Sequence, residues 1–332
     1  MSVGLRIGAR PSALALAQAA LIKRALTQRL GGLEVEIVPI RTSGDKIQTA
    51  SLARVGGKGL FVRELEQALS ERRIEAAVHS MKDLPAMLPP QFRLAAVPQR
   101  EKSYDVLLAR SLGGWASLPG GALLGTSSVR RRLQALRVCP DLEVRPLRGN
   151  VDTRLRRLRN GDFDAIILAA AGLRRLGLFS DDWLQSDDRP ADEIFVTELD
   201  LHDFVPSGGQ GALAVEALRD LPLGGSPEIE SEIQALTDLP TLAEITAERA
   251  FLATIGASCA SPVGANARAS NKSLTLHALL FSVDGGRSLS AELAAEMPAS
   301  SRDQLEQTAT RLGESLGCRM LERGAGELIG RG

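Results

Sequence analysis

The chain has 332 residues, enough for two or three domains of about 100–150 residues each. Apolar residues make up 44% of it, which provides a substantial core, whereas aromatic residues are only 3%, which disfavours a protein that stacks bases on aromatic platforms. The 40 basic and 40 acidic residues cancel, which argues against the global basic field of a nucleic-acid-binding protein.

The first hundred residues alternate strands and helices. The run "LRIGAR" predicts a first strand, and Ser12 is placed to cap a helix that continues to Leu30, just before two glycines. "LEVEIVPI" alternates like a half-buried strand, "LFVRELEQALSERR" has helical spacing, and "EAAVHS" and "RLAAV" are typical of buried strands. Arg6 and Arg10 before "ALALAQAALI" would also suit a secretory signal, but the strand and helix fit better.

Residues 98–105 look like a crossing into a second α/β unit that ends near residue 180. In it, "DVLLA", "ALLG" and "DAIILAAAG" predict strands, and "VRRRLQALRV" and "VDTRLRRLRN" predict helices. Repeated strand–helix units predict parallel sheets, which bind ligands at the carboxyl ends of their strands. An acidic stretch over residues 181–203 then leads to "VPSGGQGALAVEA".

From about residue 228 the pattern becomes that of an α+β domain. "LAEITAERAFLATI" predicts a helix, followed by a loop with Cys259, strands at "SLTLHALLF" and near 288–296, and a last helix from about 302. We therefore expect three domains, made of residues 1–98 with 204–222, residues 102–200, and residues 228–332. No stretch approaches the roughly 18 apolar residues of a membrane span, so we expect a soluble chain.

The cysteines and histidines are few and scattered. Cys139, Cys259 and Cys318 have no C-x-x-C spacing, which disfavours a metal or redox motif and suits a reducing cytoplasm. The three histidines are equally far apart, so a zinc site or a Ser–His–Asp triad has little support, and we expect no metal.

The strongest local charge is an arginine-rich stretch. Residues 126–160 hold ten arginines against three acids, and "GTSSVRRRLQ" follows a strand and opens a helix. Backbone N–H groups at a helix start favour anions, and arginine binds carboxylate or phosphate through two parallel hydrogen bonds. The pattern indicates an anion site, although a solvated basic helix face would look similar. No phosphate-loop motif is present.

Three short segments are further candidates. "VGGKGLFVRELE" fits no nucleotide-binding template, and is either an ordinary loop or a lid whose Lys58 reaches an anion. "VHSMKDLP" ends a buried strand with Lys82 and Asp83, which are either an exposed ion pair or a catalytic carboxylate with its neighbour. In "TIGASCASPVG", Cys259 is either an inert thiol or a covalent anchor.

Eight segments, in order, resemble the hydroxymethylbilane synthase (porphobilinogen deaminase) family of tetrapyrrole and haem biosynthesis. They are "LRIGARPSALAL", "RVGGKGLFVRELE", "AAVHSMKDLP", "GTSSVRRR", "LRGNVDTRL", "DAIILAAAGLRRLGL", "GGQGALAVE" and "AERAFLATIGASCASPVG". The resemblance implies an α/β fold with two domains like type II periplasmic binding proteins around a cleft, and a third, α+β domain with the cysteine loop. It implies a transferase that adds four porphobilinogen units to a dipyrromethane cofactor, held by a thioether to Cys259. Four ammonia molecules are lost, and hydrolysis releases hydroxymethylbilane.

The resemblance also implies roles for individual residues. Asp83 matches the catalytic carboxylate, and Lys82 would tune it or bind a carboxylate. The positions implied for cofactor binding are Ser12, Lys82, Asp83, Thr126, Ser127, Ser128, Arg130, Arg131, Arg148, Gly149 and Cys259. Those implied for substrate binding are Arg10, Lys58, Phe61, Arg148, Arg154 and Gln210. A cytoplasmic monomer is implied, with porphobilinogen as its small-molecule partner and no nucleic acid or membrane.

Two features depart from the family pattern: Arg54 stands where lysine is expected, and the acidic segment 181–203 is longer than expected. Two other functions compete. A non-enzymatic, two-domain protein that captures a small anion would need neither Asp83 nor the thiol of the third domain. Nucleic-acid binding through the arginine-rich helices would show a steep dependence on salt. Hinge-like segments near Pro98 and Val205 lead us to expect domain movement as the product chain grows.

Overall fold

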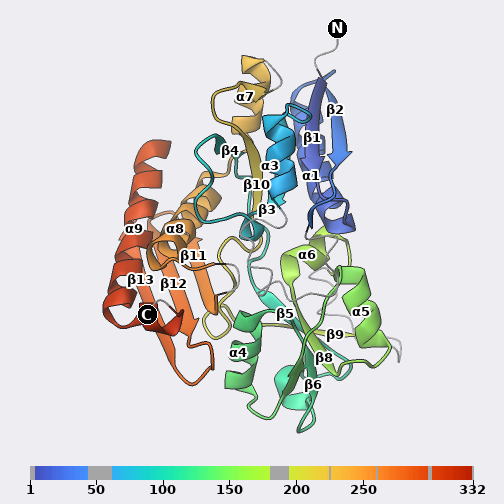
Figure 1. The fold of residues 1–332 in the computed structure, drawn as a ribbon, viewed down its shortest axis with the longest axis vertical. Helices are drawn as coiled ribbons and strands as arrows, with labels where there is room; N and C mark the ends of the chain where they lie inside the picture. The colour runs from blue at the N-terminus through green and yellow to red at the C-terminus, as the bar shows by residue number, and fades with distance from the viewer. Residues whose placement is uncertain are drawn as a thin grey trace.

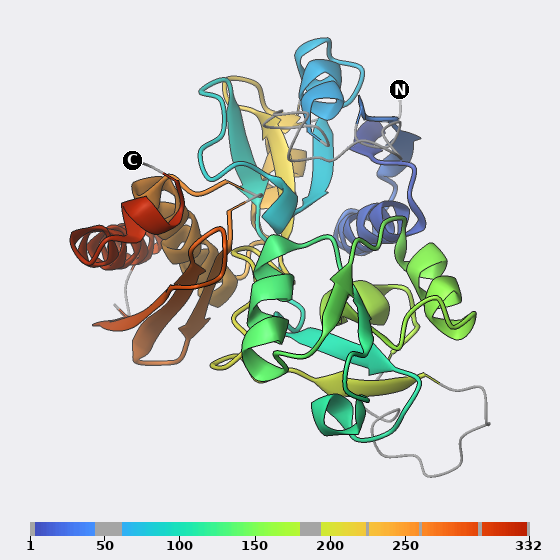
Figure 2. The ribbon, with the colours of Figure 1, turned by 60° about the horizontal axis from the view of Figure 1, so that its bottom comes forward.

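The computed structural model describes residues 4–43, 62–179, 194–223, 226–258, 261–297 and 301–330. Figure 1 shows two α/β units, one above the other, and a third unit of helices and a sheet beside them. In the view of Figure 2 the third unit again lies beside both of the others.

The first sheet has the strand order β2-β1-β3-β10-β4. Its strands are β1 (Gly4–Ala9), β2 (Glu34–Pro39), β3 (Ala76–Ser80), β4 (Phe92–Ala96) and β10 (Leu213–Leu218). Side chains of β3 point alternately to its two faces, as in any strand. Val78 packs in the cluster with α1 (Ala13–Arg29) and α7 (Pro227–Gln234), whereas Ala77 packs with α3 (Arg63–Ser70). Helix α1 begins as expected, because the Ser12 hydroxyl accepts a hydrogen bond from the amide of Ala15 at 3.3 Å.

The second sheet has the order β7-β6-β8-β5-β9. Its strands are β5 (Asp105–Ala109), β6 (Leu123–Gly125), β7 (Glu143–Arg145), β8 (Ala165–Ala169) and β9 (Phe195–Glu198). The accompanying helices are α4 (Val129–Val138), α5 (Val151–Arg159) and α6 (Ala170–Arg175), with a 3₁₀ turn, η2, at Gly114–Ser117. The side chains of Ser128 and Asn150 cap the starts of α4 and α5. Serine and asparagine are both preferred at this position of a helix.

The prediction of parallel sheets was wrong for one inner strand of each sheet. Strand β10 runs antiparallel to β3 and β4, and β5 runs antiparallel to β8 and β9. Each of these strands directly follows a segment in which the chain crosses between the units. The first crossing lies between β4 and β5, and the second lies between β9 and β10. The expected layout is confirmed: two α/β units, each with a five-stranded sheet, are followed by an α+β unit. The residue boundaries given above for three domains stay a prediction.

The third unit is an antiparallel sheet covered by two helices. Its elements are α8 (Leu239–Ile255), β11 (Val263–Ala269), β12 (Ser273–Phe281), β13 (Ser288–Glu296), α9 (Arg302–Glu322) and α10 (Ala325–Leu328). One face of β12 packs with α8 and α9, where side chains such as Phe251 are fully buried and each contributes about 1.5–3 kcal/mol. The other face of β12 contributes Phe281 to a smaller cluster with Leu133 of α4 and with Val205. The third unit therefore has a core of its own and also contacts the second.

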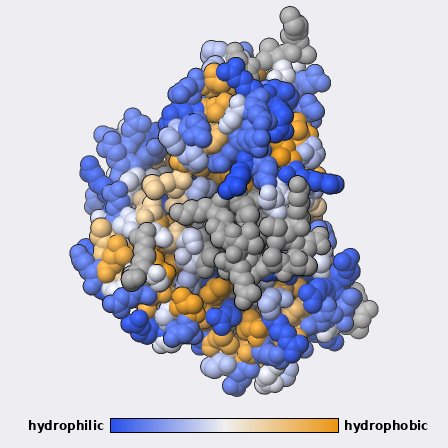
Figure 3. Space-filling model, viewed as in Figure 1, coloured by the Kyte–Doolittle hydropathy of each residue, from blue (hydrophilic) through white to orange (hydrophobic). Residues whose placement is uncertain are grey.

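Hydrophilic residues cover most of the described surface in Figure 3, and apolar ones lie among them in small groups. The most exposed large apolar side chains of the described residues are Met87, Leu112 and Val283, which are far apart in the sequence. None of the described helices combines the length and the hydropathy that crossing a membrane would require.

A buried ionic network joins the crossing segments to the third unit. The guanidinium of Arg100, on the first crossing, donates to Glu248 of α8 at 2.8 and 3.2 Å and to Glu244 at 3.1 Å. Glu248 also accepts from the amide of Gly209, on the second crossing, at 2.6 Å and from the amide of Ala267 at 2.7 Å. Burial lowers the pKa of Arg100, but the two carboxylates outweigh it and raise that pKa. One carboxylate thus fastens α8 to both crossings.

Replacing Glu248 by Gln is expected to lower the free energy of unfolding by about 3 kcal/mol, because Arg100 keeps its charge while losing a buried partner. The matched control is Glu306→Gln, which removes an exposed ion pair with Arg302 and should cost less than about 1 kcal/mol. Thermal unfolding of both variants measures the difference. Equal midpoints for the two variants would show that this network does not stabilise the contact between α8 and the two crossings.

Candidate active site

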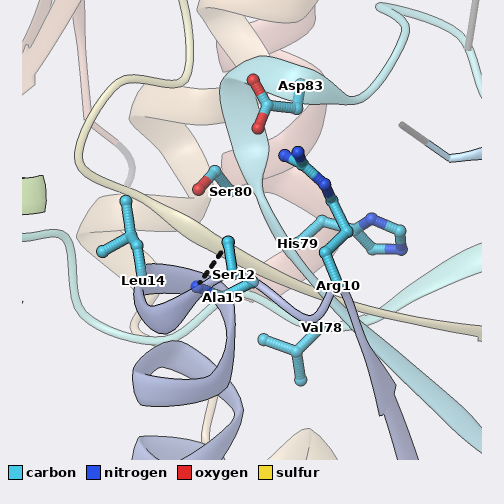
Figure 4. Close-up of a pocket in the computed structure, with 8 residues that line it drawn as sticks. All are labelled: Arg10, Ser12, Leu14, Ala15, Val78, His79, Ser80 and Asp83. Carbon is cyan, nitrogen blue, oxygen red and sulfur yellow. Dashed lines mark hydrogen bonds between the residues drawn. The ribbon is translucent and has the colours of Figure 1, made fainter. Parts of the chain in front are cut away.

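The turn after β3 brings Asp83 to a small pocket at the carboxyl end of the first sheet. A 3₁₀ turn, η1 (Met81–Asp83), follows β3, and the pocket is lined mainly by β3, η1 and the start of α1. Figure 4 shows the guanidinium of Arg10 pointing toward the carboxylate of Asp83, with Ser12 and Ser80 beside them. The cavity of about 60 Å³ has room for a few water molecules or one carboxylate group. The structure therefore brings Arg10, Ser12 and Asp83 together in one pocket, and the roles given to them stay predictions.

Lys82, next to Asp83, lies in a crowded set of charges. Burial lowers its pKa to about 8, and the charge of Arg131 acts in the same direction, whereas Asp83 and Asp105 oppose the change. Its Nζ is 3.5 Å from Oε1 of Gln210, which is fully buried. Lys82 can therefore gain or lose a proton close to neutral pH.

Asp105, the first residue of β5, is the centre of the most connected cluster. Its Oδ2 accepts from Nη2 of Arg130 at 2.7 Å, and its Oδ1 accepts from Nη2 of Arg131 at 2.7 Å and from Nε2 of Gln210 at 2.9 Å. Burial would raise the pKa of Asp105, but the charges of Arg130 and Arg131 outweigh it and hold that pKa below its usual range. One buried carboxylate thus orients two arginines and the amide of Gln210.

Arg130 and Arg131 differ in how their remaining guanidinium N–H groups are hydrogen-bonded. Arg130 also donates to the carbonyl of Val205 at 2.7 Å and lies 6.0 Å from the ring centroid of Phe204. Arg131 donates to the carbonyl of Ile167 at 3.0 Å, but its Nε is buried without a hydrogen-bond partner among the described residues. Burial lowers the pKa of the nearby Arg154 to about 10, and the charge of Arg131 adds to this effect. An anion placed here would accept a hydrogen bond from Nε of Arg131 and would stabilise the charged form of Arg154.

The three hydroxyl residues before α4 serve first to build the loop. The hydroxyl of Ser128 accepts from the amide of Arg131, and that of Thr126 accepts from the amide of Ser128. Ser127 donates to the carbonyl of Leu147 at 2.9 Å, which ties this loop to the next one, where Arg148 and Gly149 lie. Gly149 has a φ of +107°, and a Cβ there would lie 2.8 Å from a methyl group of Thr153, so the turn requires glycine.

Two residues of this region were missed by the sequence analysis. Asp105 has only a weak signal, an acid that opens an otherwise apolar strand. Arg175, at the end of α6, donates to the carbonyl of Gly211 at 2.5 Å, and burial lowers its pKa to about 10 while Glu101 opposes that change. The sequence feature that could have pointed to Arg175 is a pair of basic residues at the end of a short helix that follows a buried strand.

Three predicted site residues, Lys58, Phe61 and Cys259, lie outside the described residues, as do Arg54 and most of the long acidic segment. The ends of the cysteine loop are described. Helix α8 ends at Gly256 with a φ of +65°, and the amide of Ser261 donates to the carbonyl of Ser258 at 2.9 Å. A Cβ on Gly208 would meet Leu252, and one on Gly264 would meet Val205. The loop therefore starts and ends against the second crossing.

Within the described part of the chain, no group of three or more His, Cys, Asp and Glu side chains is arranged to hold a metal ion.

Comparison with known proteins assigns the family. Residues 5–222 match the porphobilinogen deaminase, dipyromethane cofactor binding domain, and residues 242–322 match the porphobilinogen deaminase, C-terminal domain. The chain belongs to the porphobilinogen deaminase family. Its function is accordingly that of a hydroxymethylbilane synthase, a transferase of tetrapyrrole biosynthesis that uses a dipyrromethane cofactor.

Individual relatives agree over nearly the whole length. The porphobilinogen deaminase of Syntrophobacter fumaroxidans is 41% identical over 98% of this chain and 96% of its own. The enzyme of Sorangium cellulosum is 41% identical over 96% of this chain and 99% of its own, and that of Roseiflexus castenholzii is 45% identical over 86% and 88%. Among solved structures, an ancestral arginine-binding protein bound to glutamine covers 71% of this chain and 91% of its own, at 15% identity and a TM-score of 0.35.

Proposed function

We propose that Asp83 is the catalytic carboxylate, that the arginines near Asp105 hold the acidic side chains of the growing tetrapyrrole, and that Cys259 carries the cofactor through a thioether. Each pyrrole of porphobilinogen bears an acetate and a propionate, so chain growth multiplies carboxylates in one place. The observation that supports this proposal best is Nε of Arg131, a buried cationic donor without a described partner. Such a donor fits a carboxylate.

The residues present also fit the dipyrromethane group. It would be held by Cys259 and by the cationic groups that include Arg131, Arg148 and Arg154, and when bound it supplies the free pyrrole carbon to which substrate is added. The lowered pKa of Arg154 favours an acidic ligand, because a nearby carboxylate would stabilise its charged form. Ser127 supports this part of the site by fixing the loop of Arg148.

Asp83 would act on the substrate in two ways. As ammonia leaves porphobilinogen, positive charge develops on the pyrrole, and a fixed carboxylate stabilises that charge. When the new carbon–carbon bond has formed, the carboxylate can accept the proton that the attacked pyrrole carbon loses. Arg10, which faces Asp83 in Figure 4, would bind an acidic side chain of the substrate next to this group. Lys82, with its pKa of about 8, would assist by binding a carboxylate or passing a proton.

Intact-mass measurement tests the anchor. The wild-type chain is expected to carry the added mass of two linked pyrroles, and Cys259→Ala is expected to lack it, with peptide mapping placing the addition at residue 259. Cys318→Ala, which removes an exposed thiol, is the matched control and should keep the added mass. An unmodified and freely alkylated Cys259 in protein that still consumes porphobilinogen would exclude the thioether.

We propose further that the protein works as a monomer in the cytoplasm without nucleic acid. The balanced net charge of the chain supports the last point. Sedimentation would test the monomeric state, and a filter-binding assay with duplex DNA would test the absence of nucleic-acid binding.

A further inference from the structure

Glu216, on β10, is a buried carboxylate outside the proposed cationic site. It is fully buried, and neither of its oxygens accepts a hydrogen bond in the part of the chain that the structure describes. The nearest basic atom is Nε2 of His79, on the neighbouring strand β3, at 3.0 Å from Oε2 of Glu216. Both side chains are almost inaccessible to solvent, with 0% and 3% exposed. Such a group is costly to bury unless it is compensated.

The fold does not require a charge at this position. Glu216 pairs with Ala77 on one side and Leu94 on the other, and the clusters around this face of the sheet are apolar. An apolar residue would pack in such surroundings, and replacing a buried ion pair by apolar groups is often neutral or stabilising. The carboxylate therefore calls for an explanation other than packing.

The charged groups around Glu216 come from three other elements. His79 lies on β3. Glu66 of α3 has a pKa raised by burial and by the charge of Glu216, while His79 and Arg63 oppose this. Arg249 of α8 has a pKa lowered to about 10 by burial, which the charge of Glu216 opposes. Glu216 thus lies 3.0 Å from one basic residue, His79, and its charge also acts on a second, Arg249.

His79 and Arg249 both lie close to the turn that carries Lys82 and Asp83. His79 lies four positions before Asp83 and lines the same pocket (Figure 4). Nη1 of Arg249 is 3.7 Å from Sδ of Met81, the first residue of the turn. We infer that Glu216 is a positioning residue, which uses its charge to hold His79 and Arg249 in place and so fixes the turn of Asp83. This inference rests on the role proposed for Asp83.

Glu216→Gln tests the inference, since it keeps the shape of the side chain and removes its charge. His79 and Arg249 then lack their negative partner, so the thermal midpoint should fall, while cofactor loading by mass should stay intact. The kcat for porphobilinogen should fall by about 10- to 100-fold with KM little changed, because a displaced catalytic group weakens the transition state rather than substrate binding. His79→Gln should have a similar effect, and the double variant should lose little more than either single one.

Glu230→Gln is the matched control. Glu230 accepts hydrogen bonds from Arg93, Gln234 and the amide of Leu223, so its loss should lower the midpoint and leave kcat unchanged. The inference is overturned if Glu216→Gln behaves like this control, or if neither Glu216→Gln nor His79→Gln folds. Asp83→Asn is measured alongside. If Asp83→Asn stays active, the role proposed for Asp83 fails. If it is inactive and Glu216→Gln is unimpaired, only the present inference fails.

Discussion

Asp83→Asn is expected to lower the kcat for porphobilinogen by about 10²–10³-fold, which corresponds to about 3–4 kcal/mol of lost transition-state stabilisation. Asparagine has nearly the same shape but carries no charge, so the positive charge that develops as ammonia leaves would lack its partner. The KM should change little, because the substrate's acidic groups would bind to cationic residues such as Arg10 rather than to Asp83.

Single-turnover consumption of porphobilinogen by cofactor-loaded protein measures this effect, and loading is checked by intact mass before each assay. Asp141→Asn, a change at an exposed carboxylate in the second unit, is the matched control and should retain full activity. A kcat within twofold of the wild type for loaded Asp83→Asn would remove Asp83 from the catalytic step.

Asp105→Asn is expected to lower the free energy of unfolding by about 3–5 kcal/mol and to abolish cofactor loading. Removing its charge leaves Arg130 and Arg131 buried without their shared counter-charge, which is the costly way to break a buried ion pair. The arginines would then lose the orientation that keeps Nε of Arg131 available for a ligand. Because the pKa of Asp105 is held below its usual range in the folded protein, its stabilising effect is present at neutral pH. It begins to be lost as the pH falls below about 4.

Thermal unfolding at neutral pH and intact mass measure the two effects of this change. Asp164→Asn is the control in the same unit, since the carboxylate of Asp164 accepts from the uncharged amide of Leu123, at 2.8 Å. It should cost about 1 kcal/mol and leave loading intact. Normal loading of Asp105→Asn would show that the arginines do not depend on Asp105 for their orientation.

The helix starts and strands near the site could be predicted because their signals are local. Ser12 caps α1 where the sequence places that helix start, and the alternation around Val78 follows from the period of a strand. The direction of β5 and β10 could not be predicted in this way, because an apolar run has the same pattern whichever way the strand runs.

Ion pairs between residues that are distant in sequence could not be predicted from the sequence. Asp105 meets arginines 25 and 26 residues further on, and only the fold brings them together. The hydroxyls of Thr126 and Ser128 were interpreted as ligand groups, whereas their described bonds build the loop. Near the expected hinge at Val205, the amide bonds to Gln134 and the carbonyl to Arg130 and Gln134, so this residue is firmly held. The movement of whole domains stays a prediction.

The return of the chain to the first sheet, where it forms β10, affects the order in which the chain can fold during synthesis. All five strands of the second sheet lie between residues 105 and 198, so that sheet can close as soon as this stretch has left the ribosome. The first sheet must keep a place open between β3 and β4 until residues 213–218 have emerged. The N-terminal unit, although made first, is therefore completed second, and until then β3 and β4 have unpaired edges that invite aggregation.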